Sequence, residues 1–333
     1  MVTLKDIAEA AGVSSMTVSR VLNSKTEYSR PSFAVRAQKI RKLADAMGYQ
    51  PNVAARAIST GKFASAGLFV AKKRAEGVNA GSSVFVRGLV SRLDEQSIAL
   101  SYAVVEVDQD SSPTLLRERR LDGMILEAEQ TLSLGNHKAI LGANMPVVLL
   151  NHRAEFDAAY PDEVLAAGAA TRLALEGGHR RIALLGNTDS DHFSGPDRRA
   201  GYEKAMLDAG LKPEVIHADA NNAWARAEAI APLLRRADRP TALIVIEGVW
   251  QNAMVAAAMA GLRVPEDLSL VAIGQLANAH DAQLTHVRMP TYWVGRAAAD
   301  LLVAKMISPH EPQPAVAVPY RHVDRGVTFK PIP

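Results

Sequence analysis

The first 23 residues predict two short helices joined by a glycine turn, and this pattern constrains the chain more than any other. Apolar residues at Leu4, Ile7, Ala8 and Ala11 have the i, i+3, i+4, i+7 spacing of one helix face. Gly12 is expected to end that helix, because a sharp turn needs a residue that tolerates positive φ. A cap by Thr3 and Asp6 is expected at the start of the first helix.

The second predicted helix covers residues 15–23 and leaves a polar, positively charged face outside. Val18, Val21 and Leu22 are expected to pack against the first helix. A helix of this kind after a tight turn is the arrangement that places side chains in the major groove of DNA. The residues predicted to contact DNA from this helix are Ser15, Met16, Thr17, Ser19, Arg20 and Asn23.

Arg20 is well suited to read a base, because a guanidinium donates to both acceptors on the major-groove edge of guanine. Thr17, Ser19 and Asn23 are short donors that suit phosphates. A plain helical hairpin with a solvated outer face would show the same apolar spacing. The next 40 residues favour DNA binding.

A third helix is predicted to start near Ser32, just after Pro31, and to stop at Gly48. It would complete a domain of about 50 residues, near the lower limit for independent folding. Residues 51–62 then predict a hinge whose helix is too short to be stable alone. Such a segment can fold on DNA and insert Ile58 as an apolar wedge at a minor-groove base step. An ordinary interdomain linker is the alternative. The hinge residues predicted to contact DNA are Asn52, Ala55, Arg56 and Ile58.

The charge distribution points to the same function. Residues 1–62 contain ten Lys and Arg against four Asp and Glu, a net of +6, whereas the whole chain is +3. Residues 63–333 therefore carry −3, so all the excess positive charge lies in the small N-terminal part. A protein that neutralises DNA phosphates with one domain requires this asymmetry.

The remaining residues, 63–333, predict a two-lobed α/β unit. Short apolar runs alternate with longer helical patterns, and this alternation is typical of parallel sheets with right-handed crossovers. Two such sheets side by side leave a cleft for a small ligand at the carboxyl ends of their strands. The predicted strands are 66–71, 98–104, 124–126 and 147–150 in the first lobe, and 181–186, 215–217, 242–246 and 268–273 in the second. The predicted helices include 85–96, 164–176, 198–209 and 223–235.

Composition and missing motifs exclude several classes of protein. The chain has no cysteine, which excludes disulfides, thiolate metal sites and cysteine nucleophiles. It has neither an apolar signal segment nor a run of 18 apolar residues, so we expect a cytoplasmic, nucleoid-associated protein. Phosphate-binding and dinucleotide-binding glycine loops, HExxH and a glycine-flanked nucleophilic serine are also absent. We therefore expect no enzyme activity, no cofactor and no metal site.

Two N-terminal stretches resemble the headpiece and hinge helix of the LacI/GalR, or lac-repressor-like, transcription regulators: TLKDIAEAAGVSSMTVSRVLN (3–23) and GYQPNVAARAI (48–58). Later stretches resemble the effector-binding core of that family: GHRRIALLG (178–186), RRAGY (198–202), GLRVPEDLSLVAIG (261–274) and LTHVRMPTYWVGRAAADLL (284–302). The resemblance implies a small all-α helix-turn-helix headpiece (1–50), a hinge (51–62) and a two-lobed, periplasmic-binding-protein-like core with parallel sheets (63–333). Ile58 takes the wedge position, where the family more often has Leu.

The resemblance also implies that the chain crosses between the core lobes three times. Lobe 1 is expected to comprise about 63–157 and 287–308, and lobe 2 about 158–286 and 309–333. The implied protein is a repressor controlled by a small molecule, a sugar or sugar derivative, bound between the lobes. It is expected to bind a pseudo-palindromic operator as a homodimer, since no leucine heptad of the kind that forms family tetramers is found at the end of the sequence.

The residues predicted to bind the effector are Glu127, Asn151, Arg198, Glu247 and Gln275. Arg198 matches the ligand-binding arginine of the family, and its guanidinium suits sugar hydroxyls, a carboxylate or a phosphate. Asn151, Ile246-Glu247 and Gly274-Gln275 replace residues that the family usually has as Asp, Asn-Asp and an acid. Because these replacements remove groups that would accept from sugar hydroxyls, they make a simple monosaccharide a weaker prediction for the ligand.

The retained guanidinium favours a ligand with its own negative charge or an apolar face. The carboxylates of Glu127 and Glu247 oppose an anion. A second hypothesis is a core that has lost sugar binding and serves as a module for dimerisation or for docking a corepressor.

Overall fold

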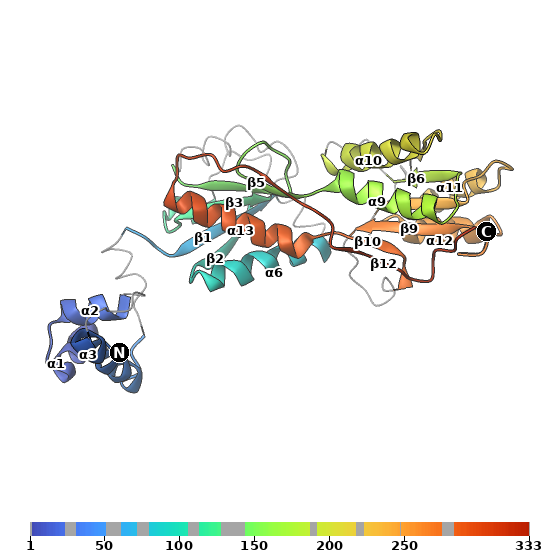
Figure 1. Cartoon of the computed structure of the whole chain (residues 1–333). Helices are drawn as coiled ribbons and strands as arrows, with labels where there is room; N and C mark the ends of the chain where they lie inside the picture. The colour runs from blue at the N-terminus through green and yellow to red at the C-terminus, as the bar shows by residue number, and fades with distance from the viewer. Residues whose placement is uncertain are drawn as a thin grey trace. The chain divides into compact units, whose positions relative to one another are not determined.

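The computed structural model describes residues 2–23, 31–50, 61–71, 80–105, 113–127, 144–186, 192–217, 223–246, 248–274 and 283–332. The chain forms two compact units, residues 1–63 and 64–333 (Figure 1). The described part of the first unit is helical, and the second contains two six-stranded sheets.

The helices of the N-terminal unit are α1 (Leu4–Ala11), α2 (Ser15–Asn23) and α3 (Pro31–Ala46). Thr3 caps α1, because its hydroxyl accepts from the Asp6 amide at 3.4 Å while the Asp6 carboxylate accepts from the Thr3 amide at 2.8 Å. The Thr3 amide and hydroxyl both donate to the Asp6 carboxylate, and these two bonds lower the pKa of Asp6. Gly12 ends α1 with φ of 67°, as the predicted turn requires.

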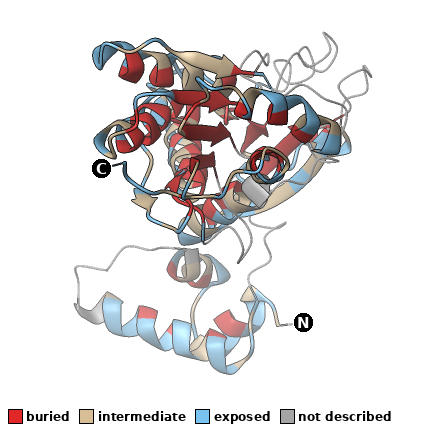
Figure 2. Cartoon of the chain, turned by 90° about the vertical axis from the view of Figure 1, so that its right-hand side faces the viewer, coloured by how far each residue is buried: buried red, intermediate tan, exposed pale blue. Residues whose placement is uncertain are grey.

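A small apolar core holds these three helices together. Val18 and Val21 are buried beside Ile7 of α1 and Ile40 of α3, and Leu22 packs against the same cluster half-buried. The predicted packing of α2 is therefore confirmed. Most other positions of the unit are exposed, as Figure 2 shows.

The first sheet has the strand order β11-β5-β4-β3-β1-β2, and its strands pair in parallel. They are β1 (Ser65–Ala71), β2 (Ala99–Val105), β3 (Gly123–Glu127), β4 (Val147–Leu150), β5 (Ala158–Pro161) and β11 (Val316–Val318). One face packs against α6 (Ala80–Glu95) and α13 (Thr291–Ile307), and the other against the short α7 (Thr114–Arg117). Ile125 and Leu126 are buried on opposite faces, which explains the unbroken apolar runs of these strands.

The second sheet has the order β12-β10-β9-β8-β6-β7, with β12 antiparallel to β10. Its strands are β6 (Ile182–Leu185), β7 (Glu214–Ile216), β8 (Ala242–Ile246), β9 (Ser269–Gly274), β10 (His286–Arg288) and β12 (His322–Asp324). Residues from α9 (Glu163–Glu176) and α10 (Ser194–Asp208) pack on one face, and residues from α11 (Ala223–Leu234) and α12 (Trp250–Met259) on the other. Figure 2 shows the strands buried between helices whose outer faces are exposed.

Among the described elements, the chain passes between the two sheets three times, after β5, after β10 and after β11. The predicted lobe boundaries are wrong in detail. β5 pairs with β4, and β11 pairs with β5, so both strands belong to the first sheet and not to the second lobe. β10 extends the second lobe past residue 287. These strands have three or four residues, too few to show a periodicity in the sequence.

Helices α9 and α10 approach each other closely at a glycine. A Cβ on Gly201 would overlap the backbone carbonyl of Val164, so only glycine fits there. A Cβ on Gly168, across the same contact, would meet only the flexible end of Arg172 at 3.0 Å and the Gly201 carbonyl oxygen at 3.6 Å. The contact therefore depends on Gly201 far more than on Gly168.

Gly201→Ala should lower the free energy of unfolding by about 1–3 kcal/mol, because the added methyl group overlaps backbone that cannot move aside. Gly168→Ala is the matched control and should change it by less than about 1 kcal/mol, since alanine also favours a helix. Urea unfolding followed by circular dichroism measures both. Equal losses for the two variants would contradict the close contact.

Candidate DNA interface and ligand site

The outer face of α2 is exposed as predicted. The Ser14 hydroxyl caps the helix by accepting from the Thr17 amide at 3.2 Å. Met16 is 81% exposed, and Ser15 and Arg20 are exposed beside it. This face presents an apolar group and a guanidinium to a partner.

The other predicted DNA contacts are less exposed or lie outside the described residues. Thr17 and Ser19 are half-buried, and the Thr17 hydroxyl is 2.9 Å from the hydroxyl of Ser14. Asn23 ends α2. The residues of the predicted sites that lie outside the described part are Asn52, Ala55, Arg56, Ile58, Glu247 and Gln275.

Glu127 and Asn151 lie at the carboxyl ends of neighbouring strands of the first sheet. Glu127 is the last residue of β3 and is 2% exposed. Asn151 follows β4, is 8% exposed and has φ of 55°, a left-handed conformation that asparagine tolerates. The carboxyl edge of a parallel sheet is where ligands bind in α/β proteins.

Two contacts join this edge to the segment that follows β6 in the second sheet. His192 donates from Nε2 to the Asn151 carbonyl oxygen at 3.1 Å, which leaves Nδ1 to accept from the Ser194 amide at 3.3 Å. Arg153 pairs with Asp197 in the first turn of α10 at 2.5 Å. We call the residues of this region the junction cluster: Asn151, Arg153, Glu163, His192, Asp197 and Arg198.

Arg198 is held by a carboxylate of the chain itself. Its Nε donates to Glu163 Oε2 at 2.7 Å and its Nη2 donates to Oε1 at 2.8 Å, a two-pronged ion pair. The Arg198 and Glu163 side chains are 13% and 3% exposed. Burial raises the pKa of Glu163, and the Arg198 guanidinium acts against that shift. The positive charge of Arg198, which the sequence suggested for binding a ligand, is thus already paired with the carboxylate of Glu163.

The sequence analysis missed Glu163, and the structure shows why. Glu163 opens α9 directly after its N-cap Asp162, whose carboxylate accepts from the Leu165 amide at 2.9 Å. An acid in the first turn of a helix is common and needs no distant partner. Its partner lies on another helix, which approaches α9 closely at Gly201.

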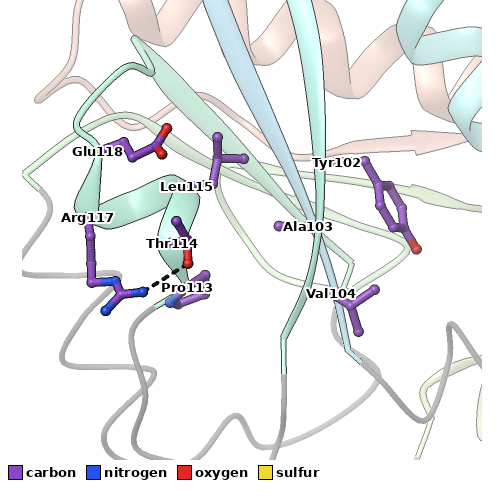
Figure 3. A pocket seen from close by; sticks show the side chains of 8 residues that line it. All are labelled: Tyr102, Ala103, Val104, Pro113, Thr114, Leu115, Arg117 and Glu118. Atoms are coloured by element: carbon purple, nitrogen blue, oxygen red, sulfur yellow. Dashed lines mark hydrogen bonds between the residues drawn. The ribbon is translucent and has the colours of Figure 1, made fainter.

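A separate open pocket of about 630 Å³ lies at the edge strand of the first sheet (Figure 3). It is lined by Tyr102, Ala103 and Val104 of β2 and by residues 113–118, excluding Leu116. Figure 3 shows Arg117 reaching back to Thr114, whose hydroxyl accepts at 2.9 Å. Of the predicted effector residues that the structure describes, Glu127, Asn151 and Arg198, none lines this pocket.

In the part of the chain that the structure describes, no group of three or more His, Cys, Asp and Glu side chains is placed to hold a metal ion. No helix among these same residues is long and apolar enough to cross a membrane.

Comparison with known proteins assigns both parts of the chain. Residues 3–52 match the bacterial regulatory proteins of the lacI family, and residues 171–328 match the periplasmic binding protein-like domain. The chain thus combines a lacI-family DNA-binding domain with a periplasmic-binding-protein-like domain. It resembles the transcriptional regulator RegA of Clostridium saccharobutylicum, with 26% identity over 98% of this chain and 99% of that one. The repressor PurR of Photobacterium profundum is 25% identical over 92% of each chain. The chain is a DNA-binding transcriptional regulator and not an enzyme.

Solved structures of the family share the fold. The lac repressor dimer bound to operator and an anti-inducer has a TM-score of 0.71 and 23% identity, over 98% of this chain and 99% of that one. The regulator CelR in complex with cellobiose has a TM-score of 0.64 and 22% identity, over 98% of this chain and 100% of that one. The predicted fold, a helical headpiece with a two-lobed core, is confirmed.

Arg198→Ala should lower the free energy of unfolding by about 3–5 kcal/mol at pH 7, because it leaves the Glu163 carboxylate buried without its guanidinium. Arg199→Ala is the control on the next residue. It removes a half-buried i,i+4 pair with Glu203 at 2.7 Å and should cost about 0.5 kcal/mol or less.

The loss in Arg198→Ala should depend on pH. Burial raises the pKa of Glu163 and Arg198 opposes the rise, so removing Arg198 raises the folded-state pKa further above the unfolded value. A raised carboxyl pKa makes the folded state bind a proton first, so stability falls as the pH rises through this window. The deficit should therefore be larger at pH 8 than at pH 5. A deficit that does not change with pH would contradict the pairing.

Proposed function

We propose that this regulator is a repressor that binds a pseudo-palindromic operator as a homodimer, under the control of a small molecule at the junction cluster. Two features that occur in the same chain carry the proposal. The outer face of α2 is exposed, and polar side chains gather in the core beside the ends of its strands. The lac repressor, captured as a dimer on its operator, supports the assembly. The repressor acts on chromosomal DNA in the cytoplasm.

Base reading falls to Ser15, Met16 and Arg20, which share the exposed face of α2. Phosphate contacts fall to Thr17, Ser19 and Asn23, and the net charge of +6 on residues 1–62 supplies the general attraction to DNA. The hinge adds Asn52, Ala55 and Arg56, with Ile58 as the wedge in the minor groove.

The effector is a sugar or a sugar derivative. The cellobiose complex of CelR supports this class of ligand, and the amide and carboxylate groups of Asn151 and Glu127 suit hydroxyl donors. Arg198, Glu247 and Gln275 complete the proposed set.

One observation favours a second candidate function, a core that no longer binds a sugar and serves as a dimerisation or corepressor-docking module. Arg198, the residue expected to bind the ligand, is already paired with Glu163. A thermal-shift screen of sugars, sugar acids and phosphosugars distinguishes the two functions. Stabilisation by any member of the screen supports the sugar-controlled repressor.

Arg20→Ala should weaken binding to the preferred operator by about 1–3 kcal/mol and leave binding to random duplexes almost unchanged, because it removes a base contact. Selection from a random DNA library supplies the operator, and electrophoretic titration then measures both affinities and the number of protomers per site. The control is the salt dependence, which should stay steep in the variant because the phosphate contacts remain. Equal losses on both DNAs, or one protomer per palindrome, would contradict the proposal.

A further inference from the structure

We propose that Glu163 sets the charge preference of the ligand site, so that the site selects an uncharged ligand over an anion. The inference rests on the proposed function, because it concerns the small molecule bound at the junction cluster. It reverses the expectation that the sequence alone supports, in which the guanidinium of Arg198 attracts a negatively charged sugar derivative.

The geometry of the ion pair supplies the first argument. Glu163 accepts from both Nε and Nη2 of Arg198, the edge with which a guanidinium binds a carboxylate or a phosphate in two-pronged fashion. An anion that binds this edge of the guanidinium would have to displace Glu163. The displaced carboxylate is 3% exposed, so it would stay buried without a counter-charge. This cost acts against an anion that binds this edge and does not act against an uncharged ligand.

The charges around the pair supply the second argument. Asp162 and Asp197 both raise the pKa of Glu163, so the three carboxylates feel one another's charge. Arg153 pairs with Asp197, so among the described residues named here three carboxylates stand against the guanidiniums of Arg153 and Arg198. The formal sum is −1, which repels anions and presents acceptors to hydroxyl donors.

The helix ends supply the third argument. The N-terminus of a helix attracts anions through its exposed amides and its dipole. Here Glu163 occupies the first turn of α9 and Asp197 the first turn of α10. The chain's own carboxylates thus offset the positive potential that an anionic ligand would otherwise use.

The test compares the wild-type chain with Glu163→Gln, which keeps the size of the side chain and removes its charge. Glu203→Gln is the matched control, since it releases the neighbouring Arg199 on the surface. Calorimetry with inorganic phosphate at constant ionic strength provides the first readout. Glu163→Gln should bind phosphate at least tenfold more tightly than the wild type and Glu203→Gln. If the variant is poorly folded, phosphate should raise its Tm and leave that of the wild type unchanged.

The second readout is a panel of neutral sugars, each with its phosphate and its acid, tested on the wild type and on Glu163→Gln. At least one neutral sugar should bind the wild type at least tenfold more tightly than its own phosphate and acid. The ratio of these affinities should be smaller in Glu163→Gln.

Three outcomes overturn the inference. Tighter binding of a charged member by the wild type overturns the charge preference and leaves ligand control intact. A phosphate affinity of Glu163→Gln equal to that of the wild type overturns the role of Glu163. A wild type that binds no member of the panel overturns ligand control in the proposed function, and the charge preference with it.

Discussion

The buried ion pair between Glu163 and Arg198 determines how the two helices on one face of the second sheet meet. α9 begins directly after β5 of the first sheet, and α10 follows β6 of the second. The pair therefore joins the first turn of α9, just after the chain leaves the first sheet, to the second turn of α10 on the second sheet. Gly201 makes this geometry possible, because any side chain there would push the helices apart. Asn151 and Arg153 then reach His192 and Asp197 across the same region.

The net charge of each unit suits what that unit binds. Residues 1–62 carry +6 and residues 63–333 carry −3, so the DNA-binding unit and the ligand-binding unit have opposite signs. The positive unit suits phosphates. The negative unit includes a junction cluster whose own carboxylates match its arginines, which suits an uncharged ligand.

Features that depend on local pattern were predictable from the sequence. The helix-turn-helix follows from apolar spacing and Gly12, and the strands 147–150 and 242–246 have the predicted bounds, because buried parallel strands are continuous apolar runs. Features that depend on distant partners were not predictable. β11 has three residues, and its pairing with β5 is set by the path of the chain. The partner of Arg198 lies 35 residues earlier on another helix, so the sequence indicated a guanidinium but not its neutralisation.

Glu163 and Arg198 form an ion pair whose two charges cancel. A double-mutant cycle tests this pairing most directly. Urea unfolding would be measured for the wild type, Glu163→Gln, Arg198→Met and the double variant. Each single substitution leaves one buried charge without its partner, whereas the double substitution removes both charges. We expect the double variant to be at least as stable as the less stable single variant, with a coupling energy above about 2 kcal/mol. Losses that simply add would contradict it.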